Sequence, residues 1–165
     1  MASNTAPDDN EVAQEFGLVR VYKSGRVVRP FLSPPAAAGL DPVTGVDSKD
    51  VHLGDYSARL YLPPSAAAAA GKLPVIVYVH GGGFVAESVV SPNGHRFLNS
   101  LAAACPAVAV SIEYRLAPEH PLPAAYDDSV AALRWVLSGA DPWVAAHGDL
   151  GRVFEIGRAS CRERV

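Results

Sequence analysis

An apolar run followed by consecutive glycines constrains the fold of this chain more than any other feature of its sequence. The run Val75–Val79 consists of β-branched and aromatic residues and shows no polar alternation. Such a run is typical of a strand buried on both faces, as in a parallel sheet between helix layers. His80 and the glycines 81–83 follow it directly. Because glycine has no Cβ, the main chain here can adopt unusual dihedral angles and approach a ligand closely.

A glycine loop at the end of a buried strand can direct several backbone N–H groups at one point. Such donors stabilise the negative charge that develops on a carbonyl oxygen during acyl transfer. A glycine triplet standing alone is usually a flexible turn, but here the strand before it and Phe84 after it restrict the loop. We therefore interpret the loop as a candidate oxyanion hole.

Composition and charge exclude several classes of function. The 165 residues are 49% hydrophobic and carry a formal net charge of −3, which is ordinary for one globular core. No basic stripe suggests a nucleic-acid partner, and no apolar run approaches the roughly 20 residues of a membrane span. The acidic N-terminus lacks the apolar segment of a secretory signal. Two unpatterned cysteines, Cys105 and Cys161, favour a reducing, cytoplasmic setting.

The first third of the chain predicts short strands and irregular segments. Residues 1–15 are polar and acidic, and we expect them to be mobile. Phe16–Val28 predicts a hairpin-like arm that turns at Ser24 and Gly25. Val51–Leu53 and Ser57–Leu62 predict two edge strands around a Gly-Asp turn. The alanine run 66–70 is too short to hold a helix between two strands, so we expect a surface loop.

The middle of the chain predicts an alternation of helices and strands. Ser91–Cys105 predicts a helix that ends before a proline, and Ala107–Ile112 predicts a second buried strand. Ala124–Ser138 predicts another helix, closed by Gly139. Its expected apolar face comprises Val130, Leu133, Trp135 and Leu137. This alternation is typical of the α/β class, with a mostly parallel sheet flanked by helices.

The pattern breaks after a further strand begins at Arg152–Phe154. Residues 155–165 carry three arginines and two glutamates. A strand buried on both faces cannot hold such charges unpaired. The segment resembles a translated sequencing-library adapter, and we expect it to be a non-native tail. The native domain would then comprise residues 16–154.

Two long motifs resemble those of plant carboxylesterases of the hormone-sensitive-lipase-like group, within the α/β-hydrolase fold. The first motif is His-Gly-Gly-Gly-Phe at 80–84, a strand-then-HGGG pattern that lipases and esterases share. The second is Glu-Tyr-Arg-Leu-Ala-Pro-Glu-His-Pro-Leu-Pro-Ala-Ala-Tyr-Asp-Asp at 113–128. The resemblance implies the N-terminal half of an α/β-hydrolase. It also implies that the strand Val75–Val79 lies between Ala107–Ile112 and the strand that begins at Val153.

The resemblance assigns roles to the glycine loop. Gly81 and Gly82 would donate backbone N–H groups to the oxyanion of an ester undergoing hydrolysis, and Gly83 would let the loop turn. His80 would orient the loop and would not be the catalytic histidine.

The resemblance also assigns a structural role to the second motif. Residues 114–128 would brace the glycine loop. We expect Arg115 to be buried and to pair with Asp128 or Glu119. Asp127 and Asp128 lie in the first turn of a predicted helix, where the helix dipole favours negative charge.

The serine nucleophile of the resembled family has no counterpart here. Family members carry Gly-Asp-Ser-Ala-Gly on a strand-to-helix turn, whereas this chain reads Gly-Arg-Ala-Ser-Cys at 157–161. Ala159 stands at the serine position, and Ser160 lies between two arginines, so we do not assign it as a nucleophile. The catalytic Asp and His would follow Val165. We therefore expect no turnover from these residues alone.

Other functions remain open within the same resemblance. Gibberellin receptors are similar but read His-Gly-Gly-Ser in the loop, so Gly83 favours an enzyme. Hydroxyisoflavanone dehydratases and intramolecular acyl transferases are enzymatic alternatives. The implied partner is a small ester, with no cofactor and no metal. The acyl and alcohol specificity, the physiological substrate and the oligomeric state stay undetermined. The remaining histidines show no metal-ligand spacing; they are His52, His95, His120 and His147.

Overall fold

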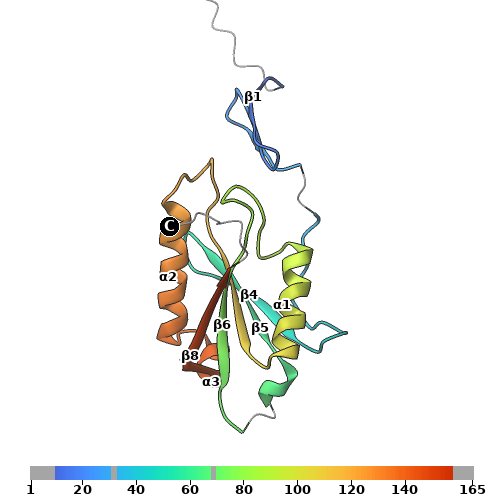
Figure 1. Ribbon diagram of the computed structural model, residues 1–165, viewed down its shortest axis with the longest axis vertical. Coiled ribbons are helices and arrows are strands. Elements are labelled where there is room, and N and C mark those ends of the chain that lie inside the picture. The colour runs from blue at the N-terminus through green and yellow to red at the C-terminus, as the bar shows by residue number, and fades with distance from the viewer. Residues whose placement is uncertain (1–9, 31–32, 68–69, 158–165) are drawn as a thin grey trace, which may run out of the picture.

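A computed structural model describes residues 10–30, 33–67 and 70–157, and its centre is a five-stranded sheet with helices on both faces (Figure 1). The strand order is β4-β5-β7-β6-β8. The strands are β4 (Asp47–His52), β5 (Ser57–Leu62), β6 (Leu73–Val79), β7 (Val108–Glu113) and β8 (Gly148–Gly157). Strand β6 runs parallel to both of its neighbours, β7 and β8, which confirms the order expected from the sequence.

β5 is an inner strand, so the prediction that Ser57–Leu62 forms an edge is wrong. It pairs antiparallel with β4 on one side and with β7 on the other. Its inner position places Arg59 in the core, where the side chain is 1% exposed. The guanidinium is tolerated there because Asp50 accepts two hydrogen bonds from it, at 2.7 and 2.8 Å.

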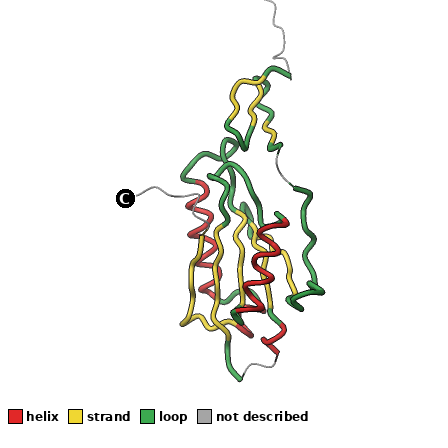
Figure 2. The backbone as a smooth tube through the Cα atoms, turned by 45° about the vertical axis from the view of Figure 1, so that its right-hand side comes forward, coloured by secondary structure: helices red, strands yellow, loops and turns green. Residues whose placement is uncertain are grey.

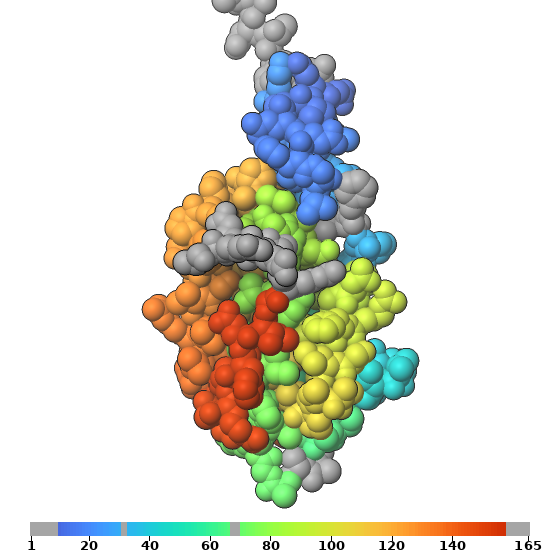
Figure 3. Space-filling view, viewed as in Figure 1, coloured from blue at the N-terminus to red at the C-terminus, as the bar shows by residue number. Residues whose placement is uncertain are grey.

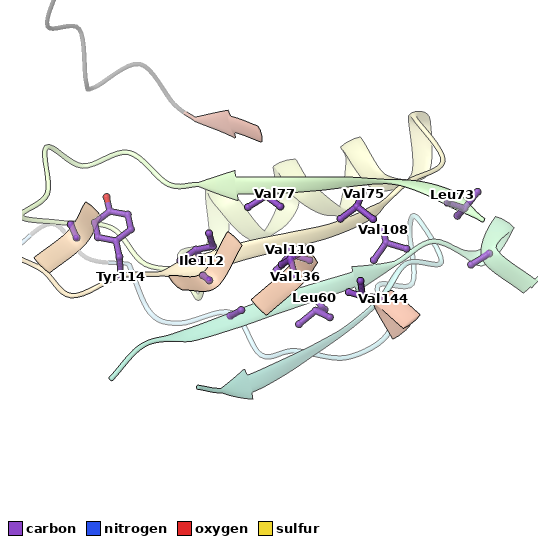
Figure 4. Close-up of a cluster of buried hydrophobic side chains, with 14 residues drawn as sticks. Leu60, Leu73, Val75, Val77, Val108, Val110, Ile112, Tyr114, Val136 and Val144 are labelled. Atoms are coloured by element: carbon purple, nitrogen blue, oxygen red, sulfur yellow. The ribbon is translucent and has the colours of Figure 1, made fainter. Parts of the chain in front are cut away.

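The side chains of β6 alternate between two hydrophobic clusters, one on each face of the sheet. Val75 and Val77 pack against the face covered by α2 (Ala124–Ser138) and α3 (Pro142–His147), as Figure 4 shows around Val110 and Val136. Ile76 belongs to the cluster beneath α1 (Pro92–Ala104). The helices lie on opposite sides of the sheet in Figure 2. The unalternating apolar run of this strand therefore follows from its burial on both faces.

α2 has the predicted bounds, and half of its predicted apolar face is confirmed, because Leu133 and Trp135 pack against the main hydrophobic cluster. Val130 and Leu137 are each 47% exposed, which corrects the apolar face expected from the sequence. The buried residues follow helical spacing and are Ala125, Asp128, Ala132 and Val136. The small alanines permit close packing, and the one charged member, Asp128, is paired with Arg115. Gly139 ends the helix at φ 66°, as expected.

The N-terminal residues form a separate three-stranded sheet, coloured blue in Figure 1. Its strands are β1 (Val12–Glu15), β2 (Arg20–Tyr22) and β3 (Val27–Val28). The predicted hairpin is present between β2 and β3. Within the segment expected to be mobile, β1 pairs with β2 and Glu15 forms an ion pair with Arg20, and the mobility itself stays a prediction. Residues 1–9 lie outside the described residues.

Two further segments differ from the sequence predictions. A 3₁₀ helix, η1 (Pro64–Ala67), occupies the start of the expected loop at 66–70. β8 begins before Arg152 and continues through Gly157, three residues beyond the proposed domain boundary at 154. β8 lies at the sheet edge, and its residues, coloured red, lie on the surface in Figure 3. Glu155 is accommodated in this strand because its side chain is exposed. The non-native origin of residues 155–165 stays a prediction, and residues 158–165 lie outside the described part of the chain.

Candidate oxyanion-hole loop

The candidate site is the loop that follows β6 at the carboxyl end of the parallel strands. Gly82 and Gly83 have positive φ values of 110° and 63°. A Cβ at Gly82 would lie 2.1 Å from the carbonyl oxygen of Ala86, whereas a Cβ at Gly83 would meet nothing within 4 Å. Glycine is therefore required at position 82, for space as well as conformation, whereas at position 83 it is favoured by conformation alone.

The hydroxyl of Tyr114 fixes the direction of two consecutive peptide groups. It donates to the carbonyl oxygens of His80, at 2.8 Å, and Gly81, at 3.3 Å. In a trans peptide the N–H points opposite to the C=O. The N–H groups of Gly81 and Gly82 are therefore both directed away from Tyr114. This is the orientation that two oxyanion-hole donors require.

His80 supports the same arrangement from inside the protein. Its Nδ1 lies 2.8 Å from the carbonyl oxygen of Gly81, which can only accept, so Nδ1 carries the proton. The ring stacks on Tyr114, with centroids 4.2 Å apart. Burial lowers the pKa of His80, although the bond to Gly81 opposes this effect. A buried, neutral imidazole in this position orients the loop, as the resemblance implied.

A tight turn and a neighbouring segment hold the far side of the loop. The N–H groups of Val85 and Ala86 both donate to the carbonyl of Gly82, at 3.2 and 3.1 Å. Phe84 has φ 62°, and its carbonyl accepts from the N–H of Ala117 at 2.8 Å. A phenylalanine in the left-handed region costs free energy, and this conformation persists only where surrounding contacts impose it. The contact with Ala117 is one such constraint.

Glu113 and Arg29 supply two side-chain supports that the sequence analysis missed. Glu113 Oε2 accepts from the hydroxyl of Ser88, at 2.8 Å, and from the N–H of Val89, at 2.6 Å. Arg29 Nε donates to the carbonyl of Val85 at 2.6 Å. Arg29 is distant in sequence and belongs to no motif, so no local pattern could have revealed it. Glu113 begins the second motif, which was the one available signal.

Arg115 of the second motif pairs with Asp128, one of the two partners predicted from the sequence. Arg115 donates from Nη2 and Nε to the carboxylate of Asp128, at 2.7 and 2.9 Å, and its backbone N–H donates to the same group at 2.9 Å. The arginine side chain is 31% exposed and not buried as expected. Burial opposes ionisation of Asp128, but the hydrogen bonds from Arg115 outweigh it and lower the pKa of this carboxyl. Glu119 pairs with Arg29 instead.

The other candidate residues do not converge on the loop. His95 lies on α1 and contacts Arg59 and Tyr61. Ala159 and Ser160 lie outside the described residues. Within the described ranges, no group of three or more His, Cys, Asp or Glu side chains could hold a metal ion. No described helix is long and apolar enough to cross a membrane.

Comparisons with known proteins agree with this geometry. A family model described as the α/β-hydrolase fold matches residues 76–160. Probable carboxylesterase 13 of Arabidopsis thaliana is 43% identical over 162 residues, covering 90% of this chain and 49% of that protein. A 2-hydroxyisoflavanone dehydratase of Glycyrrhiza echinata is 45% identical over 172 residues, covering 93% of this chain and 51% of that protein. The chain thus spans about half the length of these relatives.

Solved esterase structures resemble the described fold. A thermostable carboxylesterase cloned from a metagenomic library superposes with a TM-score of 0.59 at 36% identity, covering 69% of this chain and 37% of the other. A hyperthermophilic esterase from Pyrobaculum calidifontis gives a TM-score of 0.56 at 36% identity, covering 67% and 34% of the two chains.

Proposed function

The chain belongs to the α/β-hydrolase family, and on that premise we propose that the whole protein hydrolyses carboxylic esters through the loop Gly81–Gly83. One observation carries the proposal. Tyr114 holds the carbonyls of His80 and Gly81, so the two following N–H groups are directed together to the opposite side. The carboxylesterase relatives support the ester as the substrate class.

The proposed chemistry places the tetrahedral oxyanion against the N–H groups of Gly81 and Gly82. These donors are fixed before the substrate arrives, so little reorganisation is needed as charge develops. Gly83 lets the chain turn away after the second donor. A serine assisted by a histidine would attack the ester carbonyl. We expect these groups from the half of the relatives' length that this chain does not span.

The test requires the protein encoded by the uninterrupted transcript beyond Phe154. We expect hydrolysis of nitrophenyl butyrate that an organophosphonate serine reagent abolishes. A protein with an intact Ser-Asp-His triad that binds the reagent but leaves the ester intact would contradict the proposed reaction. Residues 1–165 assayed alone should show no turnover, and serine-dependent activity from them would refute that expectation.

A second candidate is dehydration of a 2-hydroxyisoflavanone, and the relatives that carry this name favour it. The same oxyanion hole would stabilise an enolate-like oxygen in place of a tetrahedral one. Comparing kcat/KM of the complete protein for a carboxylic ester and for a 2-hydroxyisoflavanone distinguishes hydrolysis from dehydration. A gibberellin-receptor-like binder, the remaining alternative, would turn over neither.

We propose a small-molecule ester as the partner and the cytoplasm as the location. An exposed free thiol at Cys105 supports the location, because a reducing compartment preserves such a group. Fractionation of a tagged complete protein tests it.

A further inference from the structure

Arg29 connects the N-terminal arm to the candidate oxyanion-hole loop. It follows β3 directly, and its guanidinium is 14% exposed. Nε donates to the carbonyl of Val85 at 2.6 Å, and Nη2 donates to the carbonyl of Ala117 at 3.0 Å. Nη1 and Nη2 donate to the two carboxylate oxygens of Glu119, at 2.8 and 2.7 Å. One side chain therefore contacts both segments that enclose the loop.

The positions of these contacts relate Arg29 to the glycines. Val85 closes the turn on Gly82, because its N–H donates to the carbonyl of that glycine. The N–H of Ala117 donates to the carbonyl of Phe84, a residue that lies between Gly82 and Val85 in sequence. Arg29 thus binds the carbonyls of Val85 and Ala117, two of the three residues whose N–H groups close the loop. Any movement of Val85 away from Arg29 would open the turn that sets the φ of Gly82.

The chemistry of the guanidinium suits this task. Its planar fork offers five N–H donors in fixed directions, which an ammonium group cannot reproduce. The carboxylate of Glu119 receives two parallel hydrogen bonds and fixes the plane of the fork. Hydrogen bonds from Arg29 lower the pKa of Glu119, so this carboxylate is ionised at neutral pH.

A purely structural tether for the arm would not need these partners. The other cations of the arm are paired within the N-terminal segment: Arg20 with Glu15, Lys23 with Glu11, and Arg26 over the ring of Tyr22. Arg29 differs because its side chain donates hydrogen bonds to residues 85, 117 and 119, which lie outside the arm.

We propose that Arg29 is a positioning residue for the oxyanion hole: it holds the Val85 and Ala117 carbonyls so that the turn on Gly82 stays closed. This role rests on the proposed function of the loop. It makes the residue that directly follows β3 part of the active-site architecture.

Amide hydrogen exchange resolved by residue tests the proposal in the 165-residue chain, independently of catalysis. Exchange of a hydrogen-bonded amide reports the equilibrium of its local opening. In Arg29→Gln we expect the amides of Val85, Ala86 and Ala117 to exchange about tenfold faster, the scale of a lost charge-assisted hydrogen bond. The amide of Val89, which Glu113 holds, is the internal control and should not change.

Two further variants sharpen the result. Arg26→Gln removes a cation of the same arm and should leave the three amides unchanged. Glu119→Gln keeps Arg29 and removes only the charge of its partner, so the exchange of the same amides should become about twofold faster or more. This variant tests the proposal if Arg29→Gln does not fold. Unchanged loop exchange in Arg29→Gln, or equal acceleration throughout β6 and β7, overturns the proposal. So does unchanged exchange in Glu119→Gln.

The complete protein provides a readout of positioning. Arg29→Gln should lower kcat for nitrophenyl butyrate about tenfold or more with KM nearly constant, because misplaced donors affect the transition state more than binding. A loss confined to KM overturns the positioning role. If the unsubstituted protein hydrolyses no ester, the proposed function fails, while the exchange measurement still decides whether Arg29 holds the loop.

Discussion

Replacing Gly82 with alanine should damage the loop far more than the same replacement at Gly83. Both positions have positive φ, so either alanine meets the left-handed backbone cost of about 1–2 kcal/mol. Only at position 82 does the new Cβ collide with main chain, at 2.1 Å from the oxygen and 2.6 Å from the carbon of the Ala86 carbonyl. Main-chain atoms move aside less easily than the end of a flexible side chain, because the neighbouring residues must move with them.

The magnitude follows from what must break to relieve that collision. The segment around Ala86 has to move away, and the hydrogen bonds from Val85 and Ala86 to the carbonyl of Gly82 are lost. Each of these hydrogen bonds contributes about 1 kcal/mol net to the free energy of unfolding. We expect Gly82→Ala to lower the free energy of unfolding by about 3 kcal/mol. Gly83→Ala should lower it by only about 1 kcal/mol.

Urea unfolding of the two variants measures this difference. Trp135 and Trp143 pack against the main hydrophobic cluster and provide the fluorescence signal. Gly83→Ala is the matched control, because it changes the same residue type in the same loop without the collision. Equal stability of the two variants would show that the turn on Gly82 is not closed as described, and the reasoning on the donors would fail with it.

Three further predictions concern the supports of the loop and the sheet edge. Tyr114→Phe should cost about 1–2 kcal/mol in urea unfolding, since buried carbonyls lose their hydroxyl donor; an unchanged midpoint would contradict the bracing role. Asp128→Asn should cost about 2 kcal/mol at pH 7. Because the pKa of Asp128 is lowered in the folded protein, its carboxylate contributes to stability above about pH 4, and this contribution is lost as the pH falls through the folded pKa. The free energy of unfolding, measured from pH 3 to 7, should therefore depend less on pH in the variant than in the parent. Phe154→Lys on the edge strand β8, where the side chain is 56% exposed, should reduce light scattering by self-association and change stability by no more than about 0.5 kcal/mol; scattering equal to that of the parent would count against a bare apolar edge.

The local patterns of the sequence determined the elements that depend on neighbouring residues. The apolar run before the glycines predicted a strand buried on both faces, and β6 is the central strand of the described parallel pairings. The bounds of α2 and its end at Gly139 followed from helix-stop chemistry. Such features need only the preferences of residues close together in the chain.

The face that α2 buries could not be read from periodicity. Val130 and Leu137 satisfy an apolar pattern, yet both are about half exposed. The buried side instead includes Asp128, whose charge is acceptable only because Arg115 donates to it from another segment. The burial of Arg59 in β5 has the same cause, with Asp50 as its partner. A pairing across the fold reverses the local expectation for a charged residue.

The order of residues was enough to predict a glycine loop after a buried strand, because that requires only the absence of side chains beside β-branched residues. The direction of the loop's N–H groups became visible only in the folded chain. That direction depends on the hydroxyl of Tyr114 and on the guanidinium of Arg29, which approach from segments far along the chain. Long-range hydrogen bonds set the orientation of a peptide group, and no spacing of residues along the chain encodes them.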